Sequence, residues 1–408
     1  MLKILVNAYA CSPNMGSEPG MGWNWCSNLA KYCELFIITE EEFRDKIEAV
    51  VPTLPQGKNM HFYYNPVTPE VRTMCWNQGD WRFYWHYRQW QKRTLKIAKQ
   101  ICANNRIDII HHLNMIGFRE PGLLWKIKGY MYVWGPVGGM EIMPISYLKG
   151  VGAKSVFFNW LKNVINIFQY KYQPNFHQAI KRSDAIVAAT FGCQEIIQKY
   201  YEGQVILINE TGCYPQEHIV KQEKASNQLD LMWCGKFDFR KRLDLAIRII
   251  AELKDLNVKL HVAGTGDIEK YKALTRVYGV EDKVEFYGQV NHEKINGLMQ
   301  QSDLFLFTSI MDATSTVVME AIQNHLPVVC FNTCGFGTVV DESIGVKIQL
   351  SNPEQSVNEF AEAIRALYSD RKRLEELSEN CKDRIKQFEW DYKVQRMVEI
   401  YKTCLNQL

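Results

Sequence analysis

The sequence predicts an α/β protein made of two Rossmann-like domains that face each other across a cleft. A chain of 408 residues exceeds what one hydrophobic core normally organises, so two domains of roughly 200 residues each are expected. Apolar strand-like runs alternate with amphipathic helix-like segments in both halves, which is typical of parallel sheets covered by helices. We predict an N-terminal domain at 1–213, a linker at 214–228, a C-terminal domain at 229–390, and a final helix at 391–408 that could pack back on the N-terminal domain.

The composition narrows the class of protein. Hydrophobic residues make up 47% and charged residues 23% of the chain, as in soluble globular proteins. A net charge of +3 is too small to indicate a nucleic-acid partner. The twelve cysteines follow no metal-ligand spacing and no secretory signal precedes the first strand, which together predict reduced thiols, no metal and a cytoplasmic location. Because no run approaches the roughly 18 apolar residues of a membrane span, any membrane contact is predicted to be peripheral, at the inner face.

The N-terminal domain opens with a strand at 3–7, a glycine-bearing loop, a helix reaching residue 32 and a strand at 34–39. Gly16, Ser17 and Glu18 lie in the loop. Glycines let the backbone approach a phosphate closely, and the loop leads into a helix N-terminus that favours anions. The loop is therefore a candidate binding element, with an ordinary tight turn as the alternative.

Two further segments of this domain carry candidate acceptor-binding residues. A strand at 107–112 ends in His111 and His112, at the edge where open α/β sheets bind ligands. These histidines either contact an acceptor or a sugar, or only donate structural hydrogen bonds. A strand at 130–134 leads to Gly138 and Gly139, whose backbone amides could lie near an acceptor.

Two stretches combine aromatic and basic residues. The first, at 70–105, holds Trp76, Trp81, Trp85 and Trp90 among arginines and lysines, and the second covers 156–172. The helical spacing favours packing in the core. The alternatives are a lining of the acceptor cleft or contact with a membrane surface, because amphipathic aromatic and basic surfaces bind such interfaces.

The C-terminal domain begins with a strand at 229–234 that runs into Gly235 and Lys236, followed by Lys241 and a helix at 243–254. Cations at the carboxyl end of a strand and at the entry to a helix are suited to phosphate, although a solvated basic face is the alternative. Further along, a strand at 259–263 precedes Gly264, and the segment 284–290 contains Gly288 and Val290.

The stretch from 302 to 330 predicts a buried strand, a polar turn, an amphipathic helix and a second buried strand. The candidate N-caps of the helix are Thr314, Ser315 and Thr316, so the free amides of its first turn should point into the crevice. Asp312 precedes the helix and Glu320 lies about two turns further on. This turn is a candidate site for an anion or for sugar hydroxyls. Alternatively, Asp312 only caps the helix and Glu320 is solvated.

The spacing of Asp312 and Glu320, an acid followed by seven residues and a second acid, resembles the Glu-x7-Glu motif of retaining glycosyltransferases of the GT-B fold, family 4. The resemblance implies that Asp312 contacts the donor sugar, that the amides of residues 314–316 hold sugar hydroxyls, and that Glu320 contacts the nucleoside ribose. Here the first acid is one methylene shorter than the family's glutamate, which leaves the donor sugar open.

Other segments carry the same resemblance. Lys236 and Lys241 match two cations that hold the donor diphosphate, and Gly235 precedes the first of them. Gly264 begins a Gly-x-Gly, and 284–290 is similar to a Val-x-Phe-x-Gly-x-Val segment whose last residues contact the nucleobase through the backbone. The Gly16 loop is similar to the family's Gly-Gly-x-Glu, with Ser17 in place of the second glycine. The family's histidine after the strand at 130–134 is replaced here by Gly135.

The resemblance implies transfer of a sugar, with retention, from a nucleotide-diphosphate sugar to a glycan, lipid-linked or other acceptor, in cell-surface polysaccharide synthesis. Asp312, Lys236, Lys241 and Glu320 are the predicted catalytic residues. No D-x-D motif occurs, so neither a metal nor any cofactor besides the donor substrate is expected. The alternatives are a nucleotide-sugar-binding protein without transfer activity, a GT-B epimerase and a phosphorylase-like protein.

Overall fold

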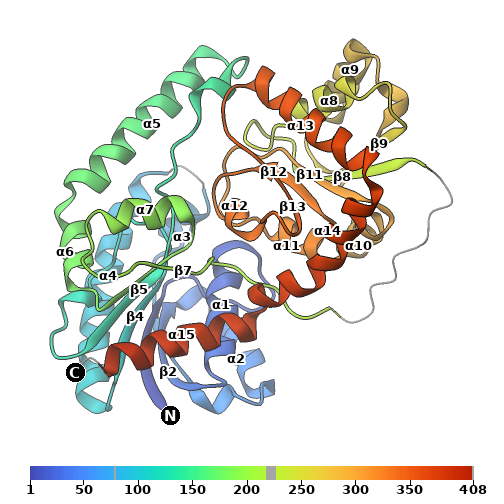
Figure 1. Ribbon diagram of the computed structural model, residues 1–408. Coiled ribbons are helices and arrows are strands. Elements are labelled where there is room, and N and C mark those ends of the chain that lie inside the picture. The colour runs from blue at the N-terminus through green and yellow to red at the C-terminus, as the bar shows by residue number, and fades with distance from the viewer. Residues whose placement is uncertain (78–79, 217–226, 407–408) are drawn as a thin grey trace. The chain divides into compact units, whose positions relative to one another are not determined.

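The computed structural model describes residues 1–77, 80–216 and 227–406, and the chain divides into two compact units (Figure 1). The first unit comprises Met1–Met140, Asn166–Glu210 and Trp390–Leu408, and the second comprises Glu141–Ile165 and Thr211–Glu389. Each unit has its own parallel β-sheet and its own hydrophobic core. The prediction of an α/β protein with two Rossmann-like domains is confirmed.

The sheet of the first unit has seven strands in the order β3-β2-β1-β4-β5-β6-β7. Most apolar residues of the five inner strands are buried, as expected for parallel strands covered on both faces, while those of the edge strands β3 and β7 are mostly half-buried. The strand order reverses between β1 and β4, which is where open α/β sheets bind ligands. The strands are β1 (Leu2–Ala8), β2 (Cys33–Glu40), β3 (Met60–Asn65), β4 (Ile109–Asn114), β5 (Met131–Val137), β6 (Ala185–Ala188) and β7 (Ile206–Leu207).

The helices of the first unit lie in the connections between its strands, except α15, which follows the second unit in the chain. They are α1 (Ser17–Leu29), α2 (Arg44–Val50), α3 (Pro69–Trp76), α4 (Arg82–Asn104), α6 (Pro174–Arg182), α7 (Phe191–Gln198) and α15 (Trp390–Leu405). Helix α5 (Ala153–Tyr172) contributes its first part to the second unit and its last turns to the first. Short 3-10 helices in this unit are η1 (Glu41–Phe43), η2 (Val51–Thr53), η3 (Gly57–Asn59) and η4 (Leu124–Lys126).

The sheet of the second unit has six strands in the order β10-β9-β8-β11-β12-β13, and the crossover predicted at 302–330 is present as β11, α11 and β12. Its strands are β8 (Leu229–Lys236), β9 (Val258–Thr265), β10 (Val284–Gly288), β11 (Leu304–Phe307), β12 (Val328–Phe331) and β13 (Gly345–Ile348). Its helices are α8 (Leu243–Glu252), α9 (Ile268–Tyr278), α10 (His292–Gln301), α11 (Thr316–Gln323), α12 (Phe336–Val339), α13 (Pro353–Ser369) and α14 (Arg371–Arg384), with 3-10 helices η5 (Ile145–Leu148), η6 (Glu281–Lys283) and η7 (Ile385–Phe388).

The boundaries of the units differ from the predicted continuous domains, because residues 141–165 cluster with the second unit and not with 1–140. Tyr147 explains this assignment. Its ring is buried in the second core, its hydroxyl lies 2.6 Å from the hydroxyl of Ser356, and its carbonyl accepts a hydrogen bond from Arg242. Most of the predicted linker, residues 217–226, lies outside the described residues.

The tryptophans of the stretch at 70–105 differ in burial. Trp90 is buried in the first core, as the core-packing interpretation expects. That interpretation is wrong for Trp76, Trp81 and Trp85, which are at least half exposed. Helix α4 therefore turns only one side toward the sheet, and its first turns carry exposed aromatic residues.

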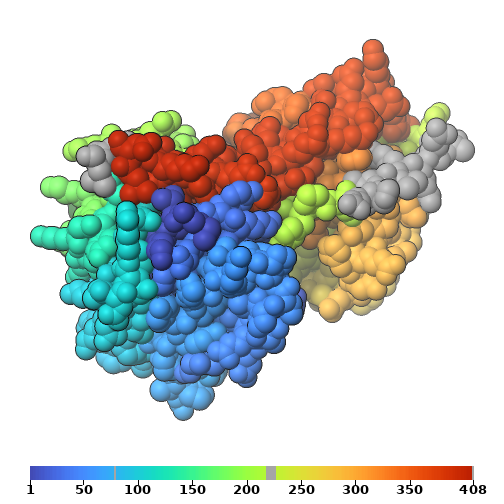
Figure 2. Space-filling model, turned by 90° about the horizontal axis from the view of Figure 1, so that it is seen from below, coloured from blue at the N-terminus to red at the C-terminus, as the bar shows by residue number. Residues whose placement is uncertain are grey.

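Helix α15 is part of the first unit and lies against the N-terminal residues (Figure 2). The rings of Trp25 and Trp390 meet edge to face, with centroids 5.5 Å apart. The buried ammonium of Lys393 lies over the Trp25 ring and donates to the carbonyl of Asn209, a distance of 2.5 Å. Further along, the hydroxyl of Tyr401 lies 2.6 Å from Nδ1 of His111 in β4. The C-terminal helix thus completes the core of the first sheet.

The Tyr401 contact generates a stability prediction. Nε2 of His111 donates to the carbonyl of Gly135 at 2.6 Å, so Nδ1 of the neutral ring accepts the hydroxyl proton of Tyr401. Tyr401→Phe leaves this buried nitrogen without a donor and should cost about 1–3 kcal/mol of unfolding free energy. Urea denaturation measures the change. Tyr392→Phe, on the exposed side of the same helix, is the matched control, and an equal effect of the two variants would contradict the prediction.

Candidate active site

The second unit gathers the predicted donor-binding segments at one edge of its sheet. Gly235 and Lys236 end β8, Gly264 lies near the end of β9, and Gly288 ends β10. The loop that holds Asp312 follows β11. Because all these strands are parallel, their carboxyl ends meet at the same edge, which is where ligands bind in open α/β sheets.

Close backbone contact explains the glycines at the ends of β8 and β9. Gly264 has φ of +150°, and a Cβ atom there would lie 1.8 Å from the carbonyl oxygen of Gly235. Gly266 has the same φ, and a Cβ atom there would lie 2.4 Å from Cβ of Phe237. A side chain at either position would separate the two strand ends. The two glycines therefore let the ends of β8 and β9 pack closely at this edge.

Lys241 and Asp312 form an ion pair at this edge. The aliphatic part of Lys241 lies beside Gly235, 3.7 Å from where a Cβ atom of that glycine would be, and its ammonium is 4.9 Å from the ring centroid of Phe307. The side chain of Lys241 is 15% exposed and that of Asp312 is 28% exposed. Lys236 is more exposed; it follows Gly235 and is the last residue of β8. The residues predicted to hold the phosphate and the sugar thus lie together.

Thr308 positions the Lys241 loop, and sequence reasoning missed it. Its hydroxyl, fully buried, accepts the Trp233 indole N–H at 3.0 Å and lies 2.9 Å from the carbonyl of Lys241. It therefore ties the loop after β8 to the end of β11. A hydroxyl residue directly after the apolar run 304–307 was the signal available in the sequence.

The turn before α11 differs in one respect from its prediction. Ser315 occupies the N-cap position of α11, but its side chain makes no capping hydrogen bond and its φ is +55°. The turn is instead supported from the loop after β12. A Cβ atom on Gly335 would lie 2.2 Å from Oγ1 of Thr314, and Sγ of Cys334 accepts from the amide of Asp312 at 3.4 Å. Sequence analysis identified neither Cys334 nor Gly335 as supports of this turn.

Glu320 lies on α11 beside the segment predicted to contact the nucleobase. Its carboxylate is 3.6 Å from Nε2 of His292, the first residue of α10, two residues after Val290. Burial raises the pKa of Glu320, although His292 opposes the shift. A half-buried carboxylate of this kind gains from hydrogen-bond donors that a ligand brings. His292 was not among the predicted site residues.

The first unit gathers its predicted loops at the carboxyl edge of β1, β4 and β5. Helix α1 begins at Ser17, directly after Gly16, and the Glu18 carboxylate accepts from the amide of Ile116 at 2.7 Å. The carbonyl of Ile116 accepts in turn from the amide of Gly138 at 2.8 Å. These contacts join the Gly16 loop to the segment after β5.

The two glycines after β5 differ in their surroundings. The amide of Gly138 is already engaged with Ile116, so it is not offered to an acceptor as expected. Gly139 is exposed and has φ of +83°.

The prediction that His111 and His112 contact a sugar or acceptor is wrong. The strand β4 continues to Asn114, so both histidines lie inside it and both are buried. Both ring nitrogens of His111 are engaged, one with the carbonyl of Gly135 and the other with the hydroxyl of Tyr401. Nδ1 of His112 lies 2.9 Å from the side-chain amide nitrogen of Asn7. Burial lowers the pKa of His111 to about 4 and that of His112 to about 3. The histidines are neutral structural residues.

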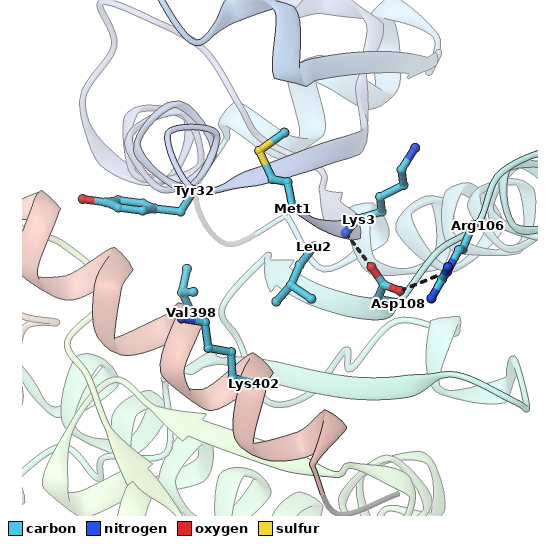
Figure 3. A pocket seen from close by; sticks show the side chains of 8 residues that line it. All are labelled: Met1, Leu2, Lys3, Tyr32, Arg106, Asp108, Val398 and Lys402. Atoms are coloured by element: carbon cyan, nitrogen blue, oxygen red, sulfur yellow. Dashed lines mark hydrogen bonds and ion pairs between the residues drawn. The ribbon is translucent and has the colours of Figure 1, made fainter.

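A surface hollow of the first unit lies at the opposite edge of its sheet (Figure 3). Asp108 accepts from the amide of Lys3 at 2.8 Å and lies 3.8 Å from Arg106, while Lys402 of α15 flanks the hollow. These groups surround the amino ends of β1 and β4, away from the carboxyl edge. The hollow is therefore separate from the candidate site.

Neither a metal-site cluster nor a membrane-spanning helix occurs among the described residues. No cluster of three His, Cys, Asp or Glu side chains there has the arrangement of a metal site. None of the helices in the described ranges combines the length and apolar character needed to cross a bilayer.

Comparisons with known proteins give the class of protein that this chain resembles. Residues 215–384 match the model of the family described as glycosyl transferases group 1. The chain is 25% identical over 182 residues to an uncharacterised glycosyltransferase of Methanocaldococcus jannaschii, covering 44% of this chain and 46% of the relative. It is 28% identical over 155 residues to the lipopolysaccharide glucosyltransferase WaaG of Escherichia coli, covering 37% and 40%. The matched part spans less than half the length of each of these relatives.

Solved structures show the same fold over the whole chain. The lipopolysaccharide outer core galactosyltransferase WaaB matches with a TM-score of 0.65 at 14% identity, over 98% of this chain and 99% of that chain. Anabaena HepE, crystallised in complex with UDP, matches with a TM-score of 0.61 at 12% identity, over 99% and 100%. The fold and the group 1 domain together confirm the resemblance to GT-B glycosyltransferases.

The Glu18 contact generates a pH prediction. Burial raises the pKa of Glu18 from 4.5 to about 7, with a further rise from Glu210, while the Ile116 amide opposes both. Between these two pH values the folded protein holds a proton that the unfolded chain has lost, so this carboxyl makes the fold less stable as pH rises from 4.5 to 7.

Glu18→Gln is neutral at every pH and keeps an oxygen for the Ile116 amide. Its melting temperature should equal that of the wild type near pH 4.5 and exceed it above pH 7, which thermal melts across this range measure. A difference that does not vary with pH would contradict the assignment.

Proposed function

We propose that the protein is a retaining glycosyltransferase that moves a sugar from a nucleotide-diphosphate sugar to a glycan or lipid-linked acceptor in cell-surface polysaccharide synthesis. The observation that carries the proposal is the ion pair between Lys241 and Asp312, which lies beside Gly235 at the end of β8. Glu320 lies on α11, the helix that follows Asp312. A cation next to a carboxylate at the carboxyl edge of a parallel sheet suits a ligand that carries both a diphosphate and a sugar. The group 1 family match of residues 215–384 supports the same class of donor.

Each residue has a proposed role in the reaction. Lys241 and Lys236 neutralise the diphosphate as the bond between the anomeric carbon and the phosphate oxygen breaks, which is an electrostatic stabilisation of the leaving group. Asp312 binds the donor sugar, and Glu320 accepts hydrogen bonds from the ribose hydroxyls. The acceptor oxygen bonds to the anomeric carbon on the face that the phosphate leaves, and its proton passes to the departing phosphate oxygen. Cations from the protein take the place of a divalent metal in this scheme.

Incubation with a panel of nucleotide sugars tests the proposal. UDP-sugars come first, because a structural neighbour is crystallised with UDP. Transfer or slow hydrolysis supports the enzyme. Binding without either reaction supports the alternative of a nucleotide-sugar-binding protein, and conversion of the sugar on its nucleotide supports an epimerase.

Lys241→Ala should lower kcat/KM for the donor about 10- to 150-fold, because it removes a charge-assisted phosphate contact of roughly 1.5–3 kcal/mol. Lys259→Ala is the matched control, since Lys259 pairs with Glu285 at 2.6 Å on β9, near the opposite end of that strand from Gly264. Steady-state kinetics and thermal melts of both variants make the comparison. Unchanged kinetics for Lys241→Ala in a folded protein would rule out its phosphate role.

Glu320→Gln and Asp312→Asn should fail in different ways. Glu320→Gln should raise the Kd of free UDP about 10- to 150-fold, since it weakens roughly 1.5–3 kcal/mol of hydrogen bonding to a charged group. Asp312→Asn should lower turnover without weakening UDP binding, because its proposed partner is the sugar and because Lys241 loses a competing carboxylate. Calorimetry with UDP and turnover with the full donor separate the two effects. The same pattern in both variants would mean that the acids are structural.

A further inference from the structure

Helix α5 presents apolar side chains outward, the reverse of an ordinary surface helix. Within this helix only Asn166 is buried. Eight large apolar side chains of α5 are exposed, and two of them, Trp160 and Val164, lie to one side. The other six recur at intervals of three and four residues and form one continuous stripe along the helix. We call this set the α5 stripe, and its six members, which are 37–66% exposed, are Phe157, Phe158, Leu161, Ile165, Phe168 and Tyr172.

Hydrogen bonds on the polar side of α5 fix this orientation. The side chain of Asn163 both accepts from the amide and donates to the carbonyl of Met143, at 3.0 and 2.8 Å. Two turns of the helix are held by Arg119, which donates to the side chains of Asn166 and Gln169. Turning the α5 stripe inward would break these bonds. The exposure of the stripe is therefore built into the fold.

The charges on α5 are all positive. Lys154, Lys162 and Lys171 are exposed, and residues 153–172 contain no acid. Lysine side chains can lie along an apolar surface while their ammonium groups reach a polar layer above it. Aromatic and aliphatic residues flanked by lysines suit a bilayer interface with anionic headgroups, into which such a helix inserts about 5–10 Å.

A second copy of the chain is a poorer occupant of this face. A symmetric pairing of two stripes would bring together the lysines of both helices without an acid on either to pair with them, and like charges at an interface are unfavourable. Anionic phospholipid carries negative charge, which residues 153–172 do not.

We propose that the α5 stripe inserts into the surface of a bilayer containing anionic phospholipids and holds the enzyme there. This proposal rests on the proposed function in one respect, because a lipid-linked acceptor gives the docking its purpose. The start of α4 in the first unit carries further exposed aromatic side chains, Trp81 at its N-cap and Trp85 in its first turn.

Flotation of the full chain with vesicles tests the proposal. Wild-type protein should float with mixed phosphatidylcholine–phosphatidylglycerol vesicles, and much less with phosphatidylcholine alone. The double variant Phe157→Ser/Phe168→Ser should remain unbound, and Lys154→Gln/Lys162→Gln/Lys171→Gln should lose the preference for anionic vesicles. Val277→Ser is the matched control, because Val277 is an apolar side chain of α9 that is 78% exposed, and it should float like the wild type.

Three results would overturn the proposal. Wild-type protein that stays unbound, or a double variant that floats as well as the wild type, excludes the α5 stripe as the membrane contact. A wild-type dimer that becomes a monomer in the double variant, seen by analytical ultracentrifugation without vesicles, assigns the stripe to a second copy instead. Calorimetry with UDP in the absence of vesicles separates the test of the membrane contact from the test of the proposed function. The double variant should bind UDP as tightly as the wild type does. If the wild type does not bind UDP, that result contradicts the proposed function and leaves the membrane proposal unaffected.

Discussion

The candidate donor site depends on one ion pair, between Lys241 and Asp312. Its two members lie 71 residues apart, one before α8 and the other before α11, so the pair exists only when β8 and β11 are neighbours in the sheet. Thr308 holds the two loops together at this point. It follows β11 directly, and its hydroxyl contacts the backbone carbonyl of Lys241. The aliphatic part of the lysine lies beside Gly235, at the end of β8. A ligand entering this edge meets two opposite charges already held at fixed positions.

The sequence allowed the two-sheet fold to be predicted, and it placed the candidate donor residues at one edge of the second sheet, because both depend on local signals. Apolar runs followed by glycines mark strands that end at a ligand edge, and the spacing of Asp312 and Glu320 marks a strand–turn–helix segment. The same reasoning failed for His111 and His112. The sequence does not show where β4 ends, and the strand continues for two residues beyond His112. Their partners, Tyr401 and Asn7, are far away in the chain, so their structural role was not visible locally.

The supports of the site were also hidden from the sequence. Cys334 and Gly335 contact the turn before α11 from a different loop, about twenty residues further along the chain. No sequence motif indicates such a contact. For the segment 156–172 the sequence left core packing, the acceptor cleft and a membrane surface open, because a mixture of aromatic and basic residues does not show which side of a helix faces the protein. Which side faces the protein was decided by Asn163 and Arg119, whose hydrogen bonds hold the polar side inward.

The division of the chain has a consequence for its biosynthesis. The first unit is interrupted twice by the second, and its last helix, α15, follows the whole of the second unit in the chain. During translation the seven strands of the first sheet are made before Trp390, Lys393 and Tyr401 exist. Until then the contacts that α15 makes with Trp25, the Asn209 carbonyl and His111 are not formed, and an apolar area that α15 later covers stays open to water. The second unit, by contrast, has all its strands before η7 is made. Nascent chains released short of residue 390 should therefore be substrates for chaperones through the first unit.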